Sequence, residues 1–268
     1  MSELTATSHH RQAARALGCL DLTSLNLDDT PARIDALCNR ALKPAPGIEI
    51  HPAAVCIYPR FVGQAKSRLK GSGIAVAAVA NFPLGTSSIG AVIREVERAL
   101  ADGADEIDVV LPFRAFLAGD HHAAAKLIHR VSSVCHDRHS VTLKVILETG
   151  VLHDASVIKA AARLAVANGA DFLKTSTGKL EPAATPEAAE ALLEVIVAAR
   201  GDGKLLGLKV AGGVKTVAEA ALYLDLADRY LQPDIAVPTN FRFGASGLLN
   251  DIINVLGSSH ETRLSSEY

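Results

Sequence analysis

The strongest constraint on the fold of this chain is an alternation that runs along most of its 268 residues. Short runs of β-branched and apolar residues alternate with longer alanine-rich stretches of helical periodicity. Such an alternation predicts parallel strands joined by crossover helices. The eight predicted strands are Cys19–Thr23, Ala53–Tyr58, Ile74–Ala80, Glu106–Leu111, Val141–Leu147, Asp171–Thr175, Leu205–Val210 and Phe241–Gly244.

Helical segments fill the intervals between these strands. Asp154 and the Thr185-Pro186 pair are N-cap signals, because a side-chain oxygen satisfies first-turn N–H groups and proline fits the first turn. The predicted helices include Ser87–Asp102, Asp154–Asn168, Pro186–Arg200 and Thr216–Tyr230.

Eight parallel strands favour a closed α/β barrel of the TIM (β/α)8 type, which typically needs about 250 residues. We expect one domain over residues 1–268, with an extra helix at Leu4–Leu17 that closes the barrel bottom. A polar C-terminal tail, flexible from about residue 258 to 268, follows the last helix. A doubly wound dinucleotide-binding sheet needs a glycine fingerprint after its first strand, whereas Gly71-Ser72-Gly73 precedes a strand. The phosphate loop of NTPases is excluded as well, because Leu173 stands where that motif requires glycine.

The composition excludes several classes of partner. A net charge of -2 and 4% aromatic residues give neither the positive field nor the stacking surface that nucleic-acid binding needs. The longest apolar run, Ile74–Ala80, is far shorter than the ~20 residues of a membrane-spanning helix. The N-terminus lacks the apolar segment of a signal peptide, so we expect a cytoplasmic protein. The four cysteines form no CxxC pair, which favours reduced core thiols over disulfides or a zinc site.

Three ionisable residues lie near the carboxyl ends of predicted strands, where TIM barrels carry their reacting groups. They are Asp108, Lys174 and Lys209. Lysine is almost never fully buried without a partner, so an ion pair with Asp108 is the alternative interpretation for either lysine alone. One carboxylate cannot neutralise both ammonium groups. We therefore interpret the three residues as catalytic.

The two lysines lie on predicted neighbouring strands, which are ~4.8 Å apart. At ~4 Å and an effective dielectric of ~20, two like charges repel by about 4 kcal/mol, equivalent to roughly three pKa units. Such a shift would leave one lysine largely neutral near pH 7 and able to attack a carbonyl carbon. Asp108 would hold the other lysine protonated or relay a proton through water.

Four further residues are expected to support this site. Lys144 and Glu148 share one face of the fifth predicted strand by its period of two, and Lys144 could be the counter-ion of Asp108. Lys144 is also the rival nucleophile, but it lies in mid-strand, whereas Lys174 meets a loop of hydroxyls and glycine. Asp21 and Cys56, near strand ends, either line the pocket or belong to the core.

Small residues follow the last two predicted strands. Gly212-Gly213 and the segment from Gly244 to Gly247 each precede a predicted helix. Glycine lets backbone N–H groups approach an anion, and a helix N-terminus attracts negative charge, so the two segments predict a phosphate pocket. Further contacts are expected from Thr177, Gly178, Lys179, Lys215 and Ser246.

Ten histidines raise the alternative of metal-assisted aldolase chemistry. Five of them cluster in the predicted helix and loop before the fifth strand, away from the strand ends, and a solvated helix face is the preferred interpretation. We therefore expect no metal site. The five are His121, His122, His129, His136 and His139.

Nine segments, in order along nearly the whole chain, resemble the class I deoxyribose-phosphate aldolase family. They are LDLTSLN, ALCNRA, VCIYPRFV, NFPLG, GADEIDVVLPFRAFLAG, LKVILETG, GADFLKTSTGK, AGGVKT and FRFGASGLL. The resemblance implies reversible cleavage of 2-deoxy-D-ribose 5-phosphate to acetaldehyde and D-glyceraldehyde 3-phosphate, with no metal or cofactor. It implies that Lys174 forms the Schiff base, Lys209 perturbs it, and Asp108 transfers protons. Related enzymes are often dimers, although the sequence identifies no interface.

The chain departs from the family pattern at Val210, Lys215 and Gly247. Lys215 stands where many relatives have arginine, and Gly247 where some have a second serine, so these changes affect the phosphate pocket most. We also hypothesise that the terminal Tyr268 folds over the pocket and assists proton transfer. The alternatives for function are another Schiff-base enzyme similar to transaldolase, and a non-catalytic sugar-phosphate-binding barrel.

Overall fold

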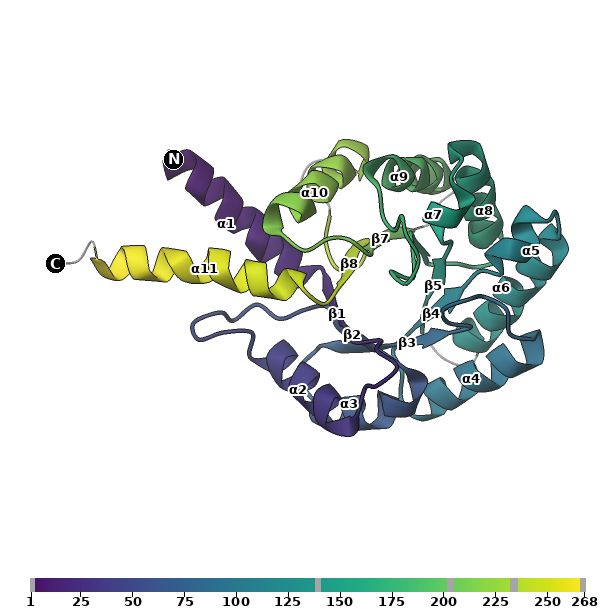
Figure 1. Ribbon diagram of the computed structural model, residues 1–268, viewed down its shortest axis with the longest axis horizontal. Coiled ribbons are helices and arrows are strands. Elements are labelled where there is room, and N and C mark those ends of the chain that lie inside the picture. Colours follow the sequence, from purple (N-terminus) through teal and green to yellow (C-terminus); the bar gives the residue numbers. More distant parts are fainter. Residues whose placement is uncertain (1–2, 138–140, 202–204, 232–235, 266–268) are drawn as a thin grey trace.

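The computed structural model describes residues 3–137, 141–201, 205–231 and 236–265. The described residues form a closed barrel of eight parallel strands, in which β8 pairs with β1 (Figure 1). Every strand lies within two residues of its predicted bounds, so the predicted TIM barrel is confirmed. The strands are β1 Leu20–Thr23, β2 Ala54–Ile57, β3 Ala75–Ala80, β4 Glu106–Val110, β5 Thr142–Ile146, β6 Phe172–Lys174, β7 Gly207–Ala211 and β8 Phe241–Ala245.

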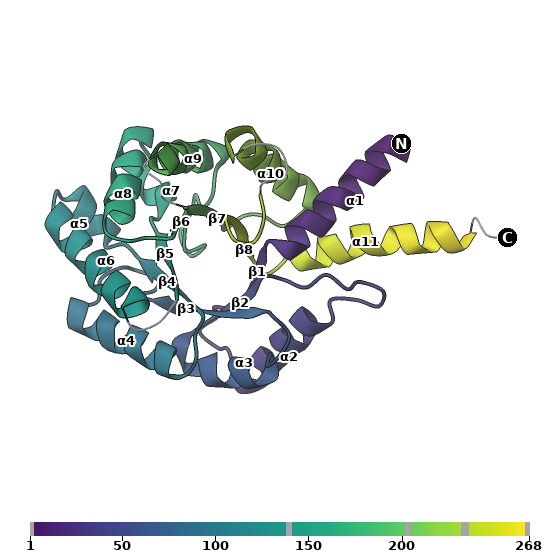
Figure 2. The ribbon, with the colours of Figure 1, turned by 180° about the vertical axis from the view of Figure 1, so that it is seen from behind.

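Helices surround the barrel on its outer side, as the views from front and back show (Figures 1 and 2). The predicted N-caps are present: Asp154 accepts hydrogen bonds from Ser156 N and Val157 N, and Thr185 accepts one from Ala188 N. The helices are α1 Glu3–Gly18, α2 Pro31–Leu42, the 3-10 turn η1 Pro59–Phe61, α3 Val62–Arg68, α4 Ile89–Ala101, α5 Phe113–Leu117, α6 His121–His136, α7 Thr149–Leu152, α8 Ala155–Ala167, α9 Pro186–Gly201, α10 Val217–Leu231 and α11 Leu248–Ser265.

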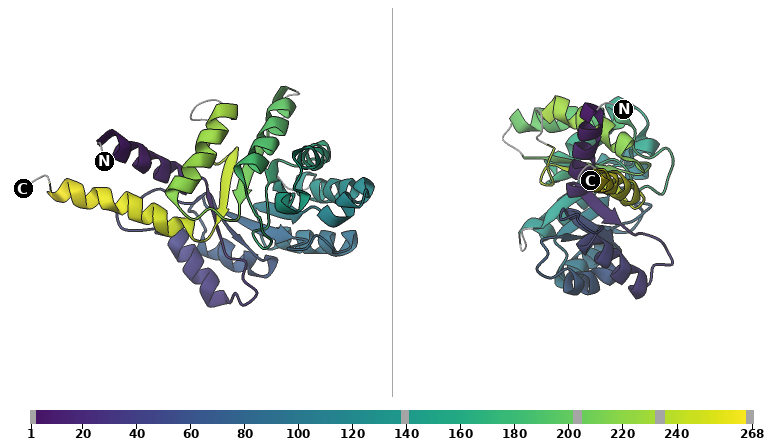
Figure 3. Two further views of the ribbon diagram at one scale, coloured as in Figure 1. Left: turned by 45° about the horizontal axis from the view of Figure 1, so that its top comes forward. Right: turned by 90° about the vertical axis from the view of Figure 1, so that its left-hand side faces the viewer.

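The terminal helices differ from the prediction in two ways. Helix α1 does not close the barrel bottom, because its polar face matches α10: Arg15 pairs with Asp228 at 2.7 Å, and Gln12 donates a hydrogen bond to Asp225. It extends beside α11 away from the barrel (Figure 3). The expected tail from residue 258 is helical as far as Ser265, since residues 258–265 contain neither proline nor glycine to stop α11.

The barrel wall is packed between two different environments. Its outer face and the surrounding helices form one large apolar core. Inside, the β2 and β3 side is filled by small apolar residues such as Cys56, Ala77 and Val79. The remaining strands direct charged side chains inward, and this interior is where the predicted site residues lie. No helix of the described residues is long and apolar enough to cross a membrane.

Candidate active site

Seven charged side chains from six strands converge inside the barrel. Each residue is at most 7% exposed, and a buried charge is tolerated only with partners of opposite sign. Together they comprise three carboxylates and four cations. They are Asp21 on β1, Glu106 and Asp108 on β4, Lys144 on β5, Lys174 on β6, Lys209 on β7 and Arg242 on β8.

Asp108 is the centre of this cluster. Its Oδ1 accepts a hydrogen bond from Lys144 Nζ at 2.7 Å, and its Oδ2 accepts from Lys209 Nζ at 2.7 Å and from Lys174 Nζ at 2.8 Å. The predicted proximity of the three catalytic candidates is confirmed, and Lys144 is paired with Asp108 as expected. Lys174 and Lys209 also lie in register on β6 and β7.

The far side of the cluster closes through Glu106 and Arg242. Glu106 accepts a hydrogen bond from Lys144 at 2.5 Å and another from Arg242 Nη2 at 2.8 Å. Arg242 Nη1 in turn donates to Asp21 Oδ1 at 2.6 Å, and Asp21 Oδ2 accepts from Lys209. We call this closed circuit the charge ring: Asp108, Lys144, Glu106, Arg242, Asp21 and Lys209.

Lys174 lies outside the charge ring. The ring alternates three carboxylates with three cations and is electrically balanced, whereas Lys174 adds a fourth cation. Among the described residues, Asp108 is the one ion-pair partner of Lys174, and each ring cation has at least two carboxylate partners. Lys174 is therefore the cation of the cluster with the fewest carboxylate partners.

The pKa shifts of Asp108 and Asp21 agree with two ionised carboxylates. Burial alone would raise the pKa of Asp108, but Lys144, Lys174 and Lys209 hold it well below its usual range. The pKa of Asp21 is lowered too, because Lys209 and Arg242 outweigh its burial.

The ring cations show the opposite response. Burial would lower the pKa of Lys209, but Asp108 and Asp21 raise it well above the ordinary value. Asp108 and Glu106 likewise raise the pKa of Lys144. The carboxylates thus keep both lysines protonated.

These contacts extend the predicted electrostatics. The sequence suggested direct repulsion between two lysines that share one carboxylate. Asp108 Oδ2 accepts hydrogen bonds from both Lys174 and Lys209, and Asp21 compensates Lys209 as well. The excess of one cation over the whole cluster adds to the repulsion between the two lysines.

Sequence reasoning missed Glu106 and Arg242. Reacting groups of such barrels are expected at the carboxyl ends of strands, whereas Glu106 is the first residue of β4. The period of two, which places Glu106 on the face of Asp108, would have found it. Arg242 sits between two phenylalanines in β8 and faces inward while Phe241 and Phe243 face the helices.

The loop after β6 is held by Glu148. The Glu148 carboxylate accepts hydrogen bonds from Thr177 Oγ1 at 2.6 Å and from Thr177 N, and burial raises its pKa. Glu148 has a φ of 57° and follows the end of β5, so it does not continue the strand face as predicted. Cys56 lies beside the cluster, with Sγ 3.8 Å from Asp108 Oδ2.

The predicted phosphate residues come together in part. Gly212 follows β7 with a φ of 88°, and a Cβ placed on it would lie 2.5 Å from Ala183 Cβ and 3.1 Å from Gly178 Cα. The loops after β6 and β7 therefore touch at glycine. Register between Ala211 and Gly244 places the end of β8 beside them. Lys179, Gly213, Lys215 and Ser246 are exposed on the loops that follow these strands.

Gly244 packs against β7. It lies within β8, as in the predicted strand Phe241–Gly244, and the strand continues to Ala245. A Cβ on Gly244 would lie 2.9 Å from Ala211 Cβ and 3.0 Å from Lys209 Cε. Glycine here makes room for the Lys209 side chain.

Carboxylates of α10 and α11 bind the backbone N–H groups at the start of α10. Glu219 accepts hydrogen bonds from Lys215 N and Thr216 N, and Asp251 accepts one from Val217 N. These acceptors occupy donors that the sequence assigned to a phosphate, which leaves Gly212, Gly213 and Ser246 as the stronger part of that prediction.

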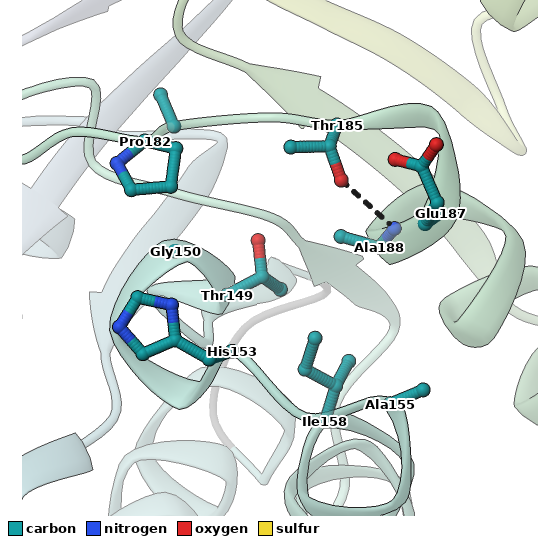
Figure 4. A pocket seen from close by; sticks show the side chains of 10 residues that line it. Thr149, Gly150, His153, Ala155, Ile158, Pro182, Thr185, Glu187 and Ala188 are labelled. Carbon is teal, nitrogen blue, oxygen red and sulfur yellow. Dashed lines mark hydrogen bonds between the residues drawn. The ribbon is translucent and has the colours of Figure 1, made fainter.

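A separate cavity lies outside the barrel interior, between α7, α8 and the loop before α9 (Figure 4). Gly150 and Pro182 face each other there, and a Cβ on Gly150 would lie 1.6 Å from Pro182 O. This close approach fixes the loop after β6 against α7.

Two predictions fall partly or wholly outside the described residues. Tyr268 and His139 are among the residues that the structure does not describe. The other four clustered histidines lie on α6 as expected, and His136 Nε2 is 2.9 Å from Asp171 Oδ2, so this residue is partnered and not simply solvated.

Comparisons with known proteins identify the family of this chain. Residues 15–250 match the model of the DeoC/LacD family aldolases. A deoxyribose-phosphate aldolase of Agrobacterium fabrum is 47% identical over 257 residues, which are 96% of either chain.

Solved structures give the same result. The apo form of a candidate deoxyribose-phosphate aldolase from Toxoplasma gondii ME49 has a TM-score of 0.83 and 28% identity, covering 94% of this chain and 98% of its own. One from Coccidioides immitis has a TM-score of 0.76 and 26% identity, covering 93% and 95%. The chain belongs to the DeoC/LacD aldolase family.

Proposed function

We propose that this enzyme is a class I deoxyribose-phosphate aldolase, which cleaves 2-deoxy-D-ribose 5-phosphate reversibly through a Schiff base on Lys174. The observation that carries the assignment of the lysine is its place outside the balanced charge ring, with Asp108 as its ion-pair partner. The similarity to the Agrobacterium fabrum deoxyribose-phosphate aldolase supports the assignment of the substrate.

The reaction begins when the neutral amine of Lys174 attacks the aldehyde carbon of the open-chain sugar. Loss of water from the resulting carbinolamine gives a protonated imine, which withdraws electrons from the neighbouring C2–C3 bond. Lys174 ends β6 and is 2% exposed, so the substrate carbonyl reaches it from the carboxyl end of the barrel.

Cleavage requires removal of the C3 hydroxyl proton. We assign this step to a water molecule held by Asp108 and Lys209, whose side chains meet at 2.7 Å. The C2–C3 bond breaks, D-glyceraldehyde 3-phosphate leaves, and an enamine remains on Lys174. Protonation of the enamine carbon and hydrolysis of the imine then release acetaldehyde. Tyr268 remains a proposed participant in that protonation.

The phosphate is assigned to the loops after β6, β7 and β8. Gly212 and Gly213 have positive φ values, which lets backbone groups approach an anion closely. Thr177, Gly178, Lys179, Lys215 and Ser246 complete the proposed pocket.

Trapping with acetaldehyde and borohydride tests the proposal. We expect a reduced two-carbon adduct on Lys174 by peptide mapping, and loss of both adduct and turnover in Lys174→Ala. An adduct on Lys144, or activity retained in Lys174→Ala, would overturn the assignment. A transaldolase-like enzyme would not take acetaldehyde as donor, and a binding barrel would hold the sugar phosphate without turnover.

We further propose that the enzyme is a homodimer, because related enzymes are often dimers. We also propose that it is cytoplasmic. Light scattering of the purified protein measures the mass of the assembly, and fractionation of cells measures the location. A monomer at micromolar concentration would contradict the first expectation.

A further inference from the structure

Two members of the charge ring lie on the side away from the proposed nucleophile. Glu106 and Arg242 pair with each other at 2.8 Å, and their remaining ion pairs go to Lys144 and Asp21. Neither has a hydrogen bond or ion pair with Lys174 in the described part of the chain. Both are nevertheless buried in the same barrel interior, at 4% and 7% exposure.

We infer that Glu106 and Arg242 are positioning residues that set the protonation of Lys174 through the charge of the ring. The inference rests on the proposed function, because it concerns the amine that attacks the substrate. It goes beyond that function by assigning a role to two residues that do not touch the reacting atoms.

The physical reason is the charge balance of a cluster that water does not screen. With Glu106 and Arg242 in place, the ring has three negative and three positive charges. Without the Arg242 charge, the ring would carry a net negative charge and would hold the proton of Lys174. Without the Glu106 charge, the ring would carry a net positive charge and would release that proton at lower pH.

Other ionisable groups share the barrel interior with Lys174. The Glu148 carboxylate accepts a hydrogen bond from Thr177. Cys56 contacts Asp108, and the other groups are members of the ring. The third strand contributes an apolar residue, Val79, in register with Asp108. The groups are Asp21 on β1, Cys56 on β2, Glu106 and Asp108 on β4, Lys144 on β5, Glu148 after β5, Lys209 on β7 and Arg242 on β8. Among the described residues, neither Glu106 nor Arg242 is an ion-pair partner of Lys174, so changing either one removes no direct partner of that lysine.

The test measures how the rate of adduct formation on Lys174 depends on pH. Acetaldehyde and cyanoborohydride are used between pH 5 and 9.5, with mass spectrometry of the peptide that carries Lys174. For Arg242→Gln we expect the half-maximal rate about one pH unit higher than in the wild type. For Glu106→Gln we expect it about one pH unit lower, the size that one unit charge ~10 Å away produces at an effective dielectric of ~20.

Matched variants separate charge from packing. Arg242→Lys and Glu106→Asp keep the charge and should keep the wild-type pH dependence. The double variant Glu106→Gln with Arg242→Gln removes one negative and one positive charge, so its midpoint should return close to that of the wild type. A purely structural role would lower the rate in every variant without moving the midpoints in opposite directions.

The outcomes are distinguishable from failure of the proposed function. If Lys174 forms no adduct in the wild type, the Schiff-base proposal fails and this inference fails with it. If the adduct forms but neither single variant moves the midpoint, or both move it the same way, the inference alone is overturned. Thermal melting confirms folding, and either folded single variant decides the result on its own.

Discussion

Three lysines of identical chemistry differ in this protein through their partners. Lys144 and Lys209 each contact two carboxylates at hydrogen-bond distance, whereas Lys174 contacts Asp108. A buried ammonium needs compensation by opposite charge. The two ring lysines are therefore suited to remain cations, and Lys174 is suited to act as an amine. Reactivity at the residue scale thus depends on how carboxylates are distributed.

Asp108→Asn tests the central carboxylate. The amide keeps the shape of the side chain but removes the charge that three lysines share. We expect kcat to fall by about 10²–10⁴-fold, the range of a lost proton-transfer group. The free energy of unfolding should also fall by about 3–5 kcal/mol, because buried cations lose a partner. Steady-state kinetics and urea unfolding measure the two effects. A kcat within threefold of the wild type would contradict the role of Asp108.

The sequence predicted the residues of this site better than their pairing. Lysines inside apolar runs are conspicuous, so Lys174, Lys209 and Lys144 could be found by eye. The identity of their counter-ions depends on which strands meet across the barrel. Asp21 and Arg242 reach each other because β1 closes against β8, and no local pattern in either strand specifies that contact.

At the scale of elements, the loops after β6 and β7 interlock through small residues. Gly178 and Gly212 approach each other closely, and Gly150 lets Pro182 pack on α7. Strand and helix bounds followed from periodicity and caps, since both signals are local. The path of α1 did not, because its packing depends on charges of α10 that lie more than 200 residues away.

Gly212→Ala tests the proposed phosphate pocket. A φ of 88° and a Cβ that would lie 2.5 Å from Ala183 Cβ both oppose alanine, at a cost of about 1–2 kcal/mol. If the loop shifts to relieve this contact, KM for 2-deoxyribose 5-phosphate should rise roughly tenfold. The kcat/KM for unphosphorylated 2-deoxyribose should change less than threefold.

The matched control is Gly71→Ala. Gly71 has a φ of 79° and open space around the added methyl group, and it lies before β3 at the opposite end of the barrel. It should introduce the same kind of backbone strain without a steric clash and leave KM unchanged. Equal losses with both sugars in Gly212→Ala would indicate a general distortion and would remove Gly212 from the phosphate pocket.

At the scale of the whole molecule, the charge ring and the apolar core both stabilise the closed barrel, from its two faces. The ring connects β1, β4, β5, β7 and β8 from inside, while the core joins the outer wall to the helices. The same burial that keeps the ring dry also encloses four thiols: Cys19, Cys38, Cys56 and Cys135. Thiols whose pKa is raised by burial in the folded state link stability to pH.

Stability should fall on the alkaline side well before the ring lysines titrate. Burial raises the pKa of Cys19 and Cys135 to about 12 and that of Cys38 to about 11, and it raises the pKa of Cys56 as well. Unfolded thiols ionise near pH 8.5. Because the folded pKa is the higher one, the stabilisation is complete below pH 8.5 and is lost as pH rises toward the folded pKa. Each thiol contributes a slope of about -1.4 kcal/mol per pH unit.

Urea unfolding in reductant between pH 7.5 and 10 measures this slope. The three thiols Cys19, Cys38 and Cys135 predict a loss of about 4 kcal/mol per pH unit above pH 9, to which Cys56 adds, and this loss is comparable with the whole stability of a domain. The double variant Cys38→Ala with Cys135→Ala should be less stable at pH 7.5, because it leaves cavities. Its slope above pH 9 should nevertheless be about half that of the wild type. The slope isolates ionisation from packing, since a cavity lowers stability equally at every pH, and an unchanged slope would mean that other groups cause the alkaline loss.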